Sequence, residues 1–378
     1  INIESIQKYG AYLGGGANIL VASWLALNFD LKYHFVDFQF EKGYSGLGFS
    51  MGFSFMWGSK REIMQIKDIR LIVPDIYPAY YQFYNTYPLA LVSVKNVAGY
   101  PIEVNVRSNL RPYSERPKDS GFIRIDKGKT VDVPVTAIFG NRLSQVSQRD
   151  PAVLDIEVEA RAGTTFKKQL SAQVIVHTRN SWNGEMDKLG WFLTSDDEKV
   201  MQLSREFTQG IQYDDNTILF RKAQSIFEKL SEIGIRYRHD PNILFYQDDR
   251  VQYAMETIEQ RGGDCDDLVI LYASFLESLG IKTAFVETRD PEKEIAHLYL
   301  LFATGMPAEQ GQLISSNEKR FILRDKSNGE KGIWIPVETT LIEKGFEEAW
   351  KMGATEYLQD GIIRNGLEQA WVKVIDVK

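Results

Sequence analysis

The only cysteine of the chain lies in a run of residues that could build a reactive thiol. Cys265 falls within 261–267, where two glycines break regular structure and Asp264 is a suitable N-cap for a helix. Apolar residues then recur at helical spacing over 268–279, and Gly280 is placed to end that helix. A thiol in a first helical turn lies at the positive end of the helix dipole, which favours the reactive thiolate.

A cysteine nucleophile also needs a base, and the segments after this helix supply one. Residues 281–287 and 297–302 are expected to form strands joined by a charged turn at 289–294, and His297 begins the second strand. A third strand, 332–340, carries Glu338. An imidazole held by a carboxylate keeps the tautomer that lets its other nitrogen accept a thiol proton, so the sequence predicts a triad in the order Cys, His, acid.

The motifs GDCDDL and LYASFLESLGIKTAFV, then a strand-borne histidine and WIPVE, resemble the bacterial transglutaminase-like cysteine peptidase family. The resemblance covers 183–378 and implies a papain-like core in which Cys265 is the nucleophile, His297 the general base and Glu338 the orienting acid. The family most often has Asp at this last position, and Glu fills the same role in other triads. Gln252 is the candidate oxyanion donor, together with the cysteine's backbone N–H.

Less specific interpretations of these residues remain open. A single buried cysteine is usually a small core residue. The acids at 266 and 267 could suggest a metal site, but first-turn acids that complement the helix dipole are expected instead. The remaining histidines, His34, His177 and His239, are expected to be structural or surface residues. Trp334 and Trp350 are expected to be core or cleft-wall aromatics. No cofactor is expected, and no acidic loop that could bind calcium is evident.

Two further parts precede this module. Residues 63–182 contain short strand candidates separated by turn signals, which favours an immunoglobulin-like β-sandwich, and the stretch 78–89 loosely resembles a domain that precedes the module in some bacterial envelope proteins. The strand candidates are 63–73, 89–97, 102–108, 131–139, 153–162 and 167–178. Within the C-terminal part, 196–209 and 217–234 have helical spacing. The fold class expected is α+β and multidomain.

Residues 1–62 are rich in strand signals. The stretch 46–55 alternates large apolar residues with Gly or Ser, and 18–28 and 33–40 are interpreted as further strands. One interpretation is a small sheet packed on the next domain. The other is barrel-like or assembly strands whose remaining neighbours lie elsewhere, because three strands cannot close a barrel that takes about eight.

Bulk properties exclude some functions. The net charge of -7 and pI near 5.4 argue against a nucleic-acid partner. No apolar run is long enough for a membrane-spanning helix, and a single cysteine allows no internal disulfide. Because the sequence begins with Ile1, a processed or trimmed chain is expected. An extracytoplasmic location in a bacterium, in the periplasm or at the outer membrane, is a hypothesis that rests on the resemblance and on the barrel-like alternation.

Two functions are compatible with this pattern. The first is cysteine hydrolase or acyltransferase chemistry on a protein or peptide amide, with hydrolysis favoured over cross-linking. The second is a non-catalytic scaffold of a cell-envelope assembly, with partners or a membrane bound through residues 1–58. A cleft that reaches Cys265 would favour the first function, whereas a cleft filled by Met255, Trp334 or the loop 303–330 would favour the second.

Overall fold

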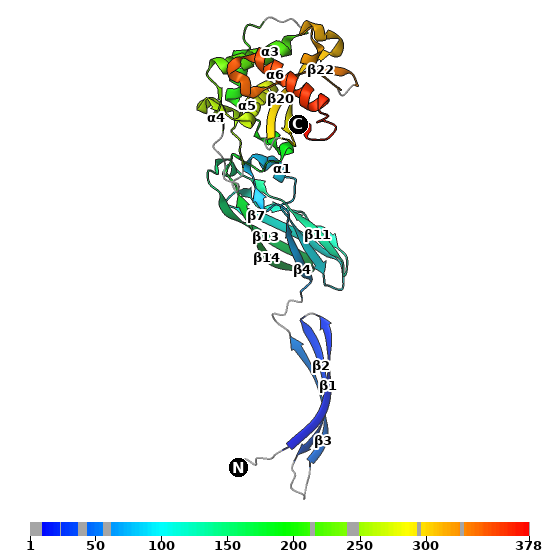
Figure 1. The fold of residues 1–378 in the computed structure, drawn as a ribbon. Coiled ribbons are helices and arrows are strands. Elements are labelled where there is room, and N and C mark those ends of the chain that lie inside the picture. Colours follow the sequence, from blue (N-terminus) through cyan, green and yellow to red (C-terminus); the bar gives the residue numbers. More distant parts are fainter. Residues whose placement is uncertain are drawn as a thin grey trace.

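The computed structural model describes residues 10–22, 24–36, 44–55, 62–211, 216–239, 249–292, 296–325 and 329–377. The chain forms three successive parts: an N-terminal three-stranded sheet, a β-rich region, and a C-terminal region of helices around a five-stranded sheet (Figure 1). No helix among these residues is long and apolar enough to cross a membrane. The immunoglobulin-like and papain-like classes stay predictions for the second and third parts.

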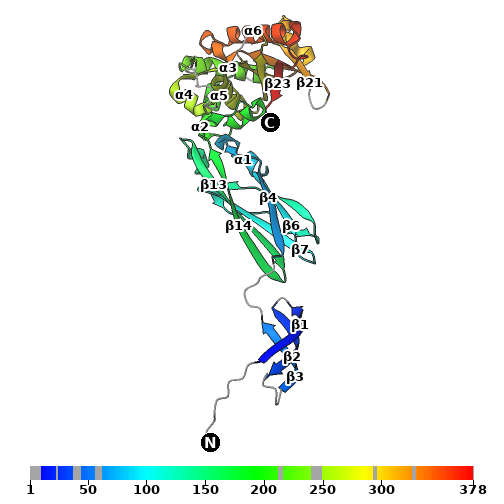
Figure 2. The same ribbon diagram turned by 60° about the horizontal axis from the view of Figure 1, so that its bottom comes forward.

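The N-terminal sheet consists of β1 (Gly10–Ala22), β2 (Leu25–Val36) and β3 (Tyr44–Phe55), paired antiparallel in that order. The prediction of one strand over 18–28 is wrong, because the first hairpin turns between Ala22 and Leu25. The strand predicted at 33–40 is the end of β2, and 37–40 lie outside the described residues. The sheet lies apart from the other two parts in both views (Figures 1 and 2), and most of its side chains are exposed. The prediction that it packs on the next domain is therefore wrong.

The β-rich region contains two main sheets, antiparallel except where β5 pairs in parallel with β14, and a single large core shared with the C-terminal region. One sheet has the order β11-β6-β4, and the other β10-β7-β13-β14-β5 with β9 beside β7. Buried and exposed residues alternate along β6 and β13, as expected for strands with one face on a core. The strands are β4 (Met64–Leu71), β5 (Asp75–Ile76), β6 (Ala90–Asn96), β7 (Ile102–Arg111), β8 (Ser114–Arg116), β9 (Lys118–Asp119), β10 (Ile123–Ile125), β11 (Thr130–Val135), β12 (Ile138–Phe139), β13 (Asp150–Ala162) and β14 (Thr164–Val176).

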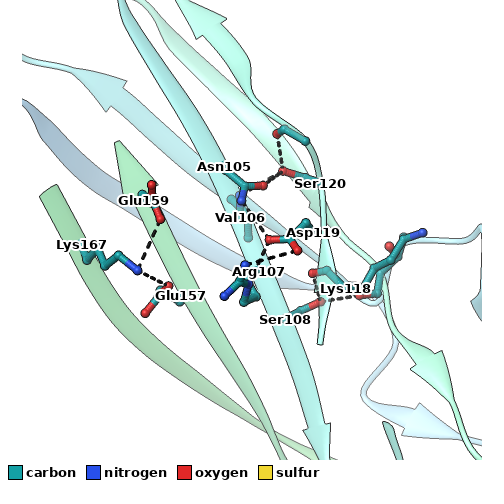
Figure 3. Close-up of polar contacts among 12 residues, drawn as sticks. Asn105, Val106, Arg107, Ser108, Lys118, Asp119, Ser120, Glu157, Glu159 and Lys167 are labelled. Atoms are coloured by element: carbon teal, nitrogen blue, oxygen red, sulfur yellow. Dashed lines mark hydrogen bonds and ion pairs between the residues drawn. The ribbon is translucent and has the colours of Figure 1, made fainter. Parts of the chain in front are cut away.

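Polar side chains connect neighbouring strands on the solvent side of this region (Figure 3). Lys167 of β14 lies 2.9 Å from Glu157 and 3.3 Å from Glu159 of β13. Arg107 of β7 pairs with Asp119 of β9 at 3.0 Å. These pairs lie at the surface, where solvent screens their charges, so the buried face supplies most of the stability.

Short helical turns connect the β-rich region with the C-terminal part: η1 (Pro78–Tyr80), α1 (Tyr81–Tyr84), η2 (Leu143–Gln145) and η3 (Met186–Phe192). Tyr80 of η1 and Phe192 of η3 meet edge to face, with ring centroids 6.3 Å apart. His177 is buried, stacks on Tyr77 and lies 2.8 Å from Asp75. These contacts make the junction a packed aromatic layer, and they give His177 a structural role.

The C-terminal region packs helices against a sheet of order β21-β22-β20-β19-β23. Its helices are α2 (Glu198–Phe207), α3 (Ile218–Glu232), α4 (Ala254–Gln260), α5 (Cys265–Ser278) and α6 (Phe346–Glu356), with the turns η4 (Ala308–Leu313), η5 (Glu318–Arg320), η6 (Thr339–Lys344) and the π-helical η7 (Tyr357–Ile363). The sheet strands are β19 (Thr283–Arg289), β20 (Ala296–Pro307), β21 (Ile322–Asp325), β22 (Lys331–Val337) and β23 (Val372–Asp376). The short strands β15 (Ser181–Trp182), β16 (Arg236–Tyr237), β17 (Asp249–Arg250) and β18 (Gly262–Gly263) form two-stranded bridges.

Helix α5 is the central helix of this region. It is buried almost throughout, because apolar residues occur on all its sides, and it contacts α2, α3, α4 and β20. Tyr272 illustrates this burial, since its ring packs edge to face on Phe227 at 5.3 Å and its hydroxyl donates to the Ala223 carbonyl at 2.9 Å. A helix fixed on all sides holds its first residue in one place.

Candidate active site

Cys265 is the first residue of α5 and is half-buried. Asp264 is the N-cap, and its carboxylate accepts from the Asp267 N–H at 3.4 Å. The two preceding glycines form β18, paired parallel to β16 (Arg236–Tyr237). Gly262 has a φ of +150°, and a Cβ there would come within 2.4 Å of the Arg236 carbonyl oxygen. The glycines therefore permit close backbone pairing of β18 with β16, and this pairing fixes the position of the chain directly before α5.

Asp267 anchors Gln252 beside this first turn. Its Oδ1 accepts from the Gln252 backbone N–H at 2.7 Å, and its Oδ2 accepts from the Gln252 side-chain amide. All these groups are buried, and Gln252 Oε1 has no partner among the described residues. Sequence reasoning interpreted Asp267 as a dipole-complementing acid, whereas here it also holds the candidate oxyanion donor in place. One hydrogen of the Gln252 amide is used by Asp267, which leaves the second for another acceptor.

His297 and Glu338 form a direct pair. His297 Nε2 lies 2.6 Å from Glu338 Oε2, and the other carboxylate oxygen accepts from Thr340 N–H at 2.9 Å and from Thr340 Oγ1 at 2.5 Å. Glu338 is 2% exposed, whereas the His297 side chain is 33% exposed. Glu338 is the N-cap of η6, directly after β22, so the strand ends earlier than the predicted 340. A fixed, buried acid thus orients an imidazole that reaches solvent.

A second carboxyl group, which the sequence did not single out, adjoins this pair. Glu356 Oε2 lies 3.9 Å from His297 Nε2. Helix α6 approaches β22 closely at Gly353, where a Cβ would lie 2.9 Å from the Val337 nitrogen. Burial, followed by the charge of Glu338, raises the pKa of Glu356 to about 8. Two carboxyl groups near one imidazole make the site sensitive to pH, and no sequence motif could have indicated the second because it comes from another helix.

The same groups set the pKa values of the pair. Burial alone would lower the pKa of His297, but the hydrogen bond and charge of Glu338, with the charge of Glu356, raise it above its ordinary value. Burial would raise the pKa of Glu338, yet the hydrogen bond from His297 holds it below its ordinary value. Both shifts favour an imidazolium–carboxylate pair over the two neutral groups once His297 has taken up a proton.

The Cys265 thiol is near this pair but is not hydrogen-bonded to it in the described part of the chain. Helix α5 packs against β20, which contains His297, and against η6, whose N-cap is Glu338. The charge of Glu338 contributes to the raised pKa of the thiol. Burial, then the charges of Asp266 and Asp264, raises the pKa of Cys265. The expectation that the helix N-terminus favours thiolate is therefore wrong for the resting site, because burial and flanking acids outweigh the dipole. Catalytic hydrogen bonds are often long before substrate binds.

Among the residues that the structure describes, two groups of side chains have the composition of metal ligands. They are Asp264, Cys265 and Asp266, and His297, Glu338 and Glu356, with ligand atoms within 4.8 Å of one another in each group. Asp266 is buried with its pKa raised well above the ordinary value, first by burial and then by its hydrogen bond with Asp264. In the second group, one ligand atom of His297 and one of Glu338 are already joined by their hydrogen bond.

The aromatic residues and the loop that were considered as possible fillers of a cleft have packing partners of their own. Trp350 donates to the Arg320 carbonyl at 2.6 Å, and Arg324 lies over the Trp334 ring at 4.4 Å. Met255 packs against the core, and the loop 303–330 is partly the continuation of β20, followed by η4, η5 and β21. Cys265 is half-buried, and the His297 side chain is 33% exposed.

Residues 198–339 match the model of the transglutaminase-like superfamily, and this part of the chain is a transglutaminase-like domain. The matched range contains Cys265, His297, Glu338 and Gln252, and it ends just before Thr340. The comparison with curated proteins found no match to this chain.

Proposed function

We propose that the C-terminal region is a cysteine hydrolase that acts on a protein or peptide amide. The observation that carries the proposal is the 2.6 Å hydrogen bond between His297 Nε2 and Glu338, with the Cys265 thiol at the start of the helix packed beside them. Because Nε2 is occupied by the acid, Nδ1 is the nitrogen available to accept the thiol proton. Glu338, although longer than the usual Asp, holds the ring and is itself held by Thr340.

The reaction proceeds in two stages. Cys265 Sγ attacks the amide carbonyl while His297 accepts the thiol proton, and the resulting oxyanion accepts from the Cys265 N–H and the Gln252 amide. The C–N bond then breaks, His297 returns the proton to the leaving amine, and a thioester remains. Water attacks the thioester with His297 as base, which releases the acid and restores the thiol. An amine in place of water would give cross-linking.

The raised pKa of Cys265 fits a thiol that ionises only as its proton passes to His297. Burial disfavours a free thiolate, but an ion pair with imidazolium is stabilised by the adjacent carboxylate. This arrangement protects the resting site from oxidation, because the thiolate is the form that oxidants attack.

An acyl-enzyme experiment tests the proposal. The chain is mixed with p-nitrophenyl acetate, and acetylation of Cys265 is followed by intact mass. We expect rapid acetylation of Cys265 followed by slow deacylation in the wild type, and neither step at a measurable rate in His297→Ala. Glu343→Gln, which alters an exposed acid of η6, is the control and should behave as wild type. Transfer of the acetyl group to an added primary amine would identify an acyltransferase. Acetylation at an equal rate in wild type and His297→Ala would contradict the proposal.

One observation favours the second candidate, a non-catalytic scaffold in a cell-envelope assembly. The Cys265 thiol has a raised pKa and no hydrogen bond to His297 among the described residues, as in a site that no longer reacts. The scaffold function predicts that Cys265→Ser leaves the protein's cellular role intact. A loss of that role in the serine variant would favour the hydrolase.

A further inference from the structure

The N-terminal sheet has two faces of opposite character. Its register aligns Ile19 of β1 with Leu27 of β2 and Phe53 of β3. Because side chains alternate along a strand, every second residue of each strand joins this face. In β3 the face contains Leu47, Phe49, Met51, Phe53 and Phe55, and β2 supplies Leu and Phe opposite them. One face of the sheet is thus continuously apolar across all three strands.

This apolar face is not covered by the described part of the chain. Leu13 is 79% exposed, Leu47 68% and Phe49 67%. Isolated exposed apolar residues are common, but an unbroken apolar face on three long strands is not, and such a face marks an interaction surface. The question is what covers it.

The opposite face is small and polar. Asp30, Lys32 and His34 project from β2 on this side, and glycines of the flanking strands make room for them. A Cβ at Gly16 would lie 2.2 Å from Asp30 Oδ1, one at Gly14 2.7 Å from Lys32 Cγ, and one at Gly48 2.9 Å from His34 Nε2. Charged side chains therefore lie over glycine backbone on one face only. A sheet covered by protein on both faces would be apolar on both.

The dimensions of the sheet match a lipid bilayer. Ten residue steps along β2, from Leu25 to Phe35, span roughly 33 Å, and a tilt of about 40° reduces this height to about 25 Å, the apolar band of membrane-spanning strands. Aromatic residues lie at both ends, with Trp24 stacked on Phe55 at 6.2 Å and Tyr33 edge to face with Phe35 at 4.8 Å. Aromatic residues at the two ends of an apolar band fit the two membrane–water interfaces.

We propose that β1, β2 and β3 form part of a closed, membrane-spanning sheet whose apolar face contacts lipid acyl chains. The outer edges of β1 and β3 are unpaired within the described residues. Open edges are not stable in hydrocarbon, so both edges need neighbouring strands. β1 and β3 run in the same direction, because each is antiparallel to β2. If copies of this sheet were arranged around an axis, β3 of one copy would pair in parallel with β1 of the next. Antiparallel pairing at these two edges would therefore need strands other than β1, β2 and β3.

Fluorescence quenching in membranes tests this proposal. The full chain is produced in the cells that make it naturally, so that neighbouring strands are present, with Cys265→Ser as background and one new cysteine in β3. Phe49→Cys, Met51→Cys and Phe53→Cys sample the apolar face, and Ser50→Cys, Gly52→Cys and Ser54→Cys are matched controls on the other face. Each cysteine carries an environment-sensitive dye, and the isolated membranes receive lipids with a nitroxide on the acyl chain.

We expect quenching at 49, 51 and 53 to exceed that at 50, 52 and 54 severalfold, in an alternating pattern. Shielding of the odd positions from both lipid nitroxide and aqueous iodide would show that a protein covers this face, and would overturn the proposal. A chain found only in the soluble fraction would also overturn it. As a second measurement, Phe49→Asp is expected to reduce recovery in the membrane fraction severalfold, whereas Ser50→Asp is not, and equal recovery would contradict the assignment of faces.

Discussion

His297 Nε2 lies 2.6 Å from Glu338 Oε2, while the second oxygen of Glu338 is held by Thr340. This relationship decides which nitrogen of the imidazole can serve the thiol. It also places a buried carboxylate where it would stabilise the imidazolium that the proposed mechanism forms from the Cys265 proton. In the proposed mechanism charge therefore separates only during the reaction, because burial and flanking acids disfavour a thiolate before it.

Glu338→Gln tests the role of the acid. The amide keeps the side chain's size but removes the charge that raises the pKa of His297. We expect alkylation of Cys265 at neutral pH to slow by roughly tenfold or more, because an amide no longer fixes the tautomer that leaves Nδ1 free to accept the thiol proton, and this loss outweighs the lower pKa of His297. Rates measured by intact mass check this, with Glu343→Gln as the exposed control. An unchanged rate would show that Glu338 has only a structural role.

Glu356→Gln should change the pH dependence of stability. The pKa of Glu356 is about 8 in the folded chain and 4.5 in the reference state, so between these values the folded state holds a proton that the unfolded state has lost. Stability from this group is present below about pH 4.5 and is lost as pH rises to about 8. Urea denaturation should show that the glutamine variant gains stability over wild type at pH 8, by roughly 1–3 kcal/mol. A constant difference from pH 5 to pH 8 would contradict a raised pKa.

The same variant should shift the reactivity of the thiol. Glu356 is among the charges that raise the pKa of His297, and only the neutral imidazole can accept a proton. Near and above about pH 8, where Glu356 is ionised, removing its charge should therefore shift the rise of Cys265 alkylation to lower pH. The pH profile of the labelling rate checks this shift, and a shift to higher pH would show that Glu356 does not act through charge.

Gly263→Ala tests the anchoring of Gln252. A Cβ at Gly263 would lie 2.4 Å from Asp267 Cβ and Oδ2, so Asp267 would have to move and release its buried partners. We expect a loss of about 2–4 kcal/mol in the free energy of unfolding, the range for breaking a buried, charged hydrogen-bond network. Gly99→Ala is the matched control, because no atom lies within 4 Å of its Cβ position. Equal stability of the two variants would contradict this account of Gly263.

Local sequence patterns predicted many of the helices and strands. Strand alternation predicted β6 and β13 within a few residues, and helical spacing predicted α2, α3 and α5. The turn between β1 and β2 was missed because Ala22 to Leu25 carries no Gly or Pro. Gly14 and Gly16 of β1 make room for Lys32 and Asp30 of β2, and the pattern within one strand does not show which side chains lie opposite it.

The sequence indicated the residues whose types suit catalysis, but not the contacts and pKa values that depend on how the helices and strands pack. The spacing of Cys265, His297 and Glu338 on a helix and two strands was visible in sequence, and the roles of these residues remain predictions. Glu356 was not visible, because it approaches His297 only through the close contact of α6 at Gly353. The pKa of Cys265 was predicted with the wrong sign, since burial cannot be inferred from a position at a helix N-terminus.

The most direct test of the central claim is the alkylation rate of Cys265 against pH, by intact mass, for wild type, His297→Ala and the exposed control His239→Ala. The account predicts a wild-type rate that rises as His297 loses its proton, above its ordinary pKa of about 6.5. It also predicts a rate at least tenfold lower at pH 8 in His297→Ala, because a buried thiol without its base stays protonated. Identical profiles for wild type and His297→Ala would contradict the claim that His297 serves as the base for Cys265.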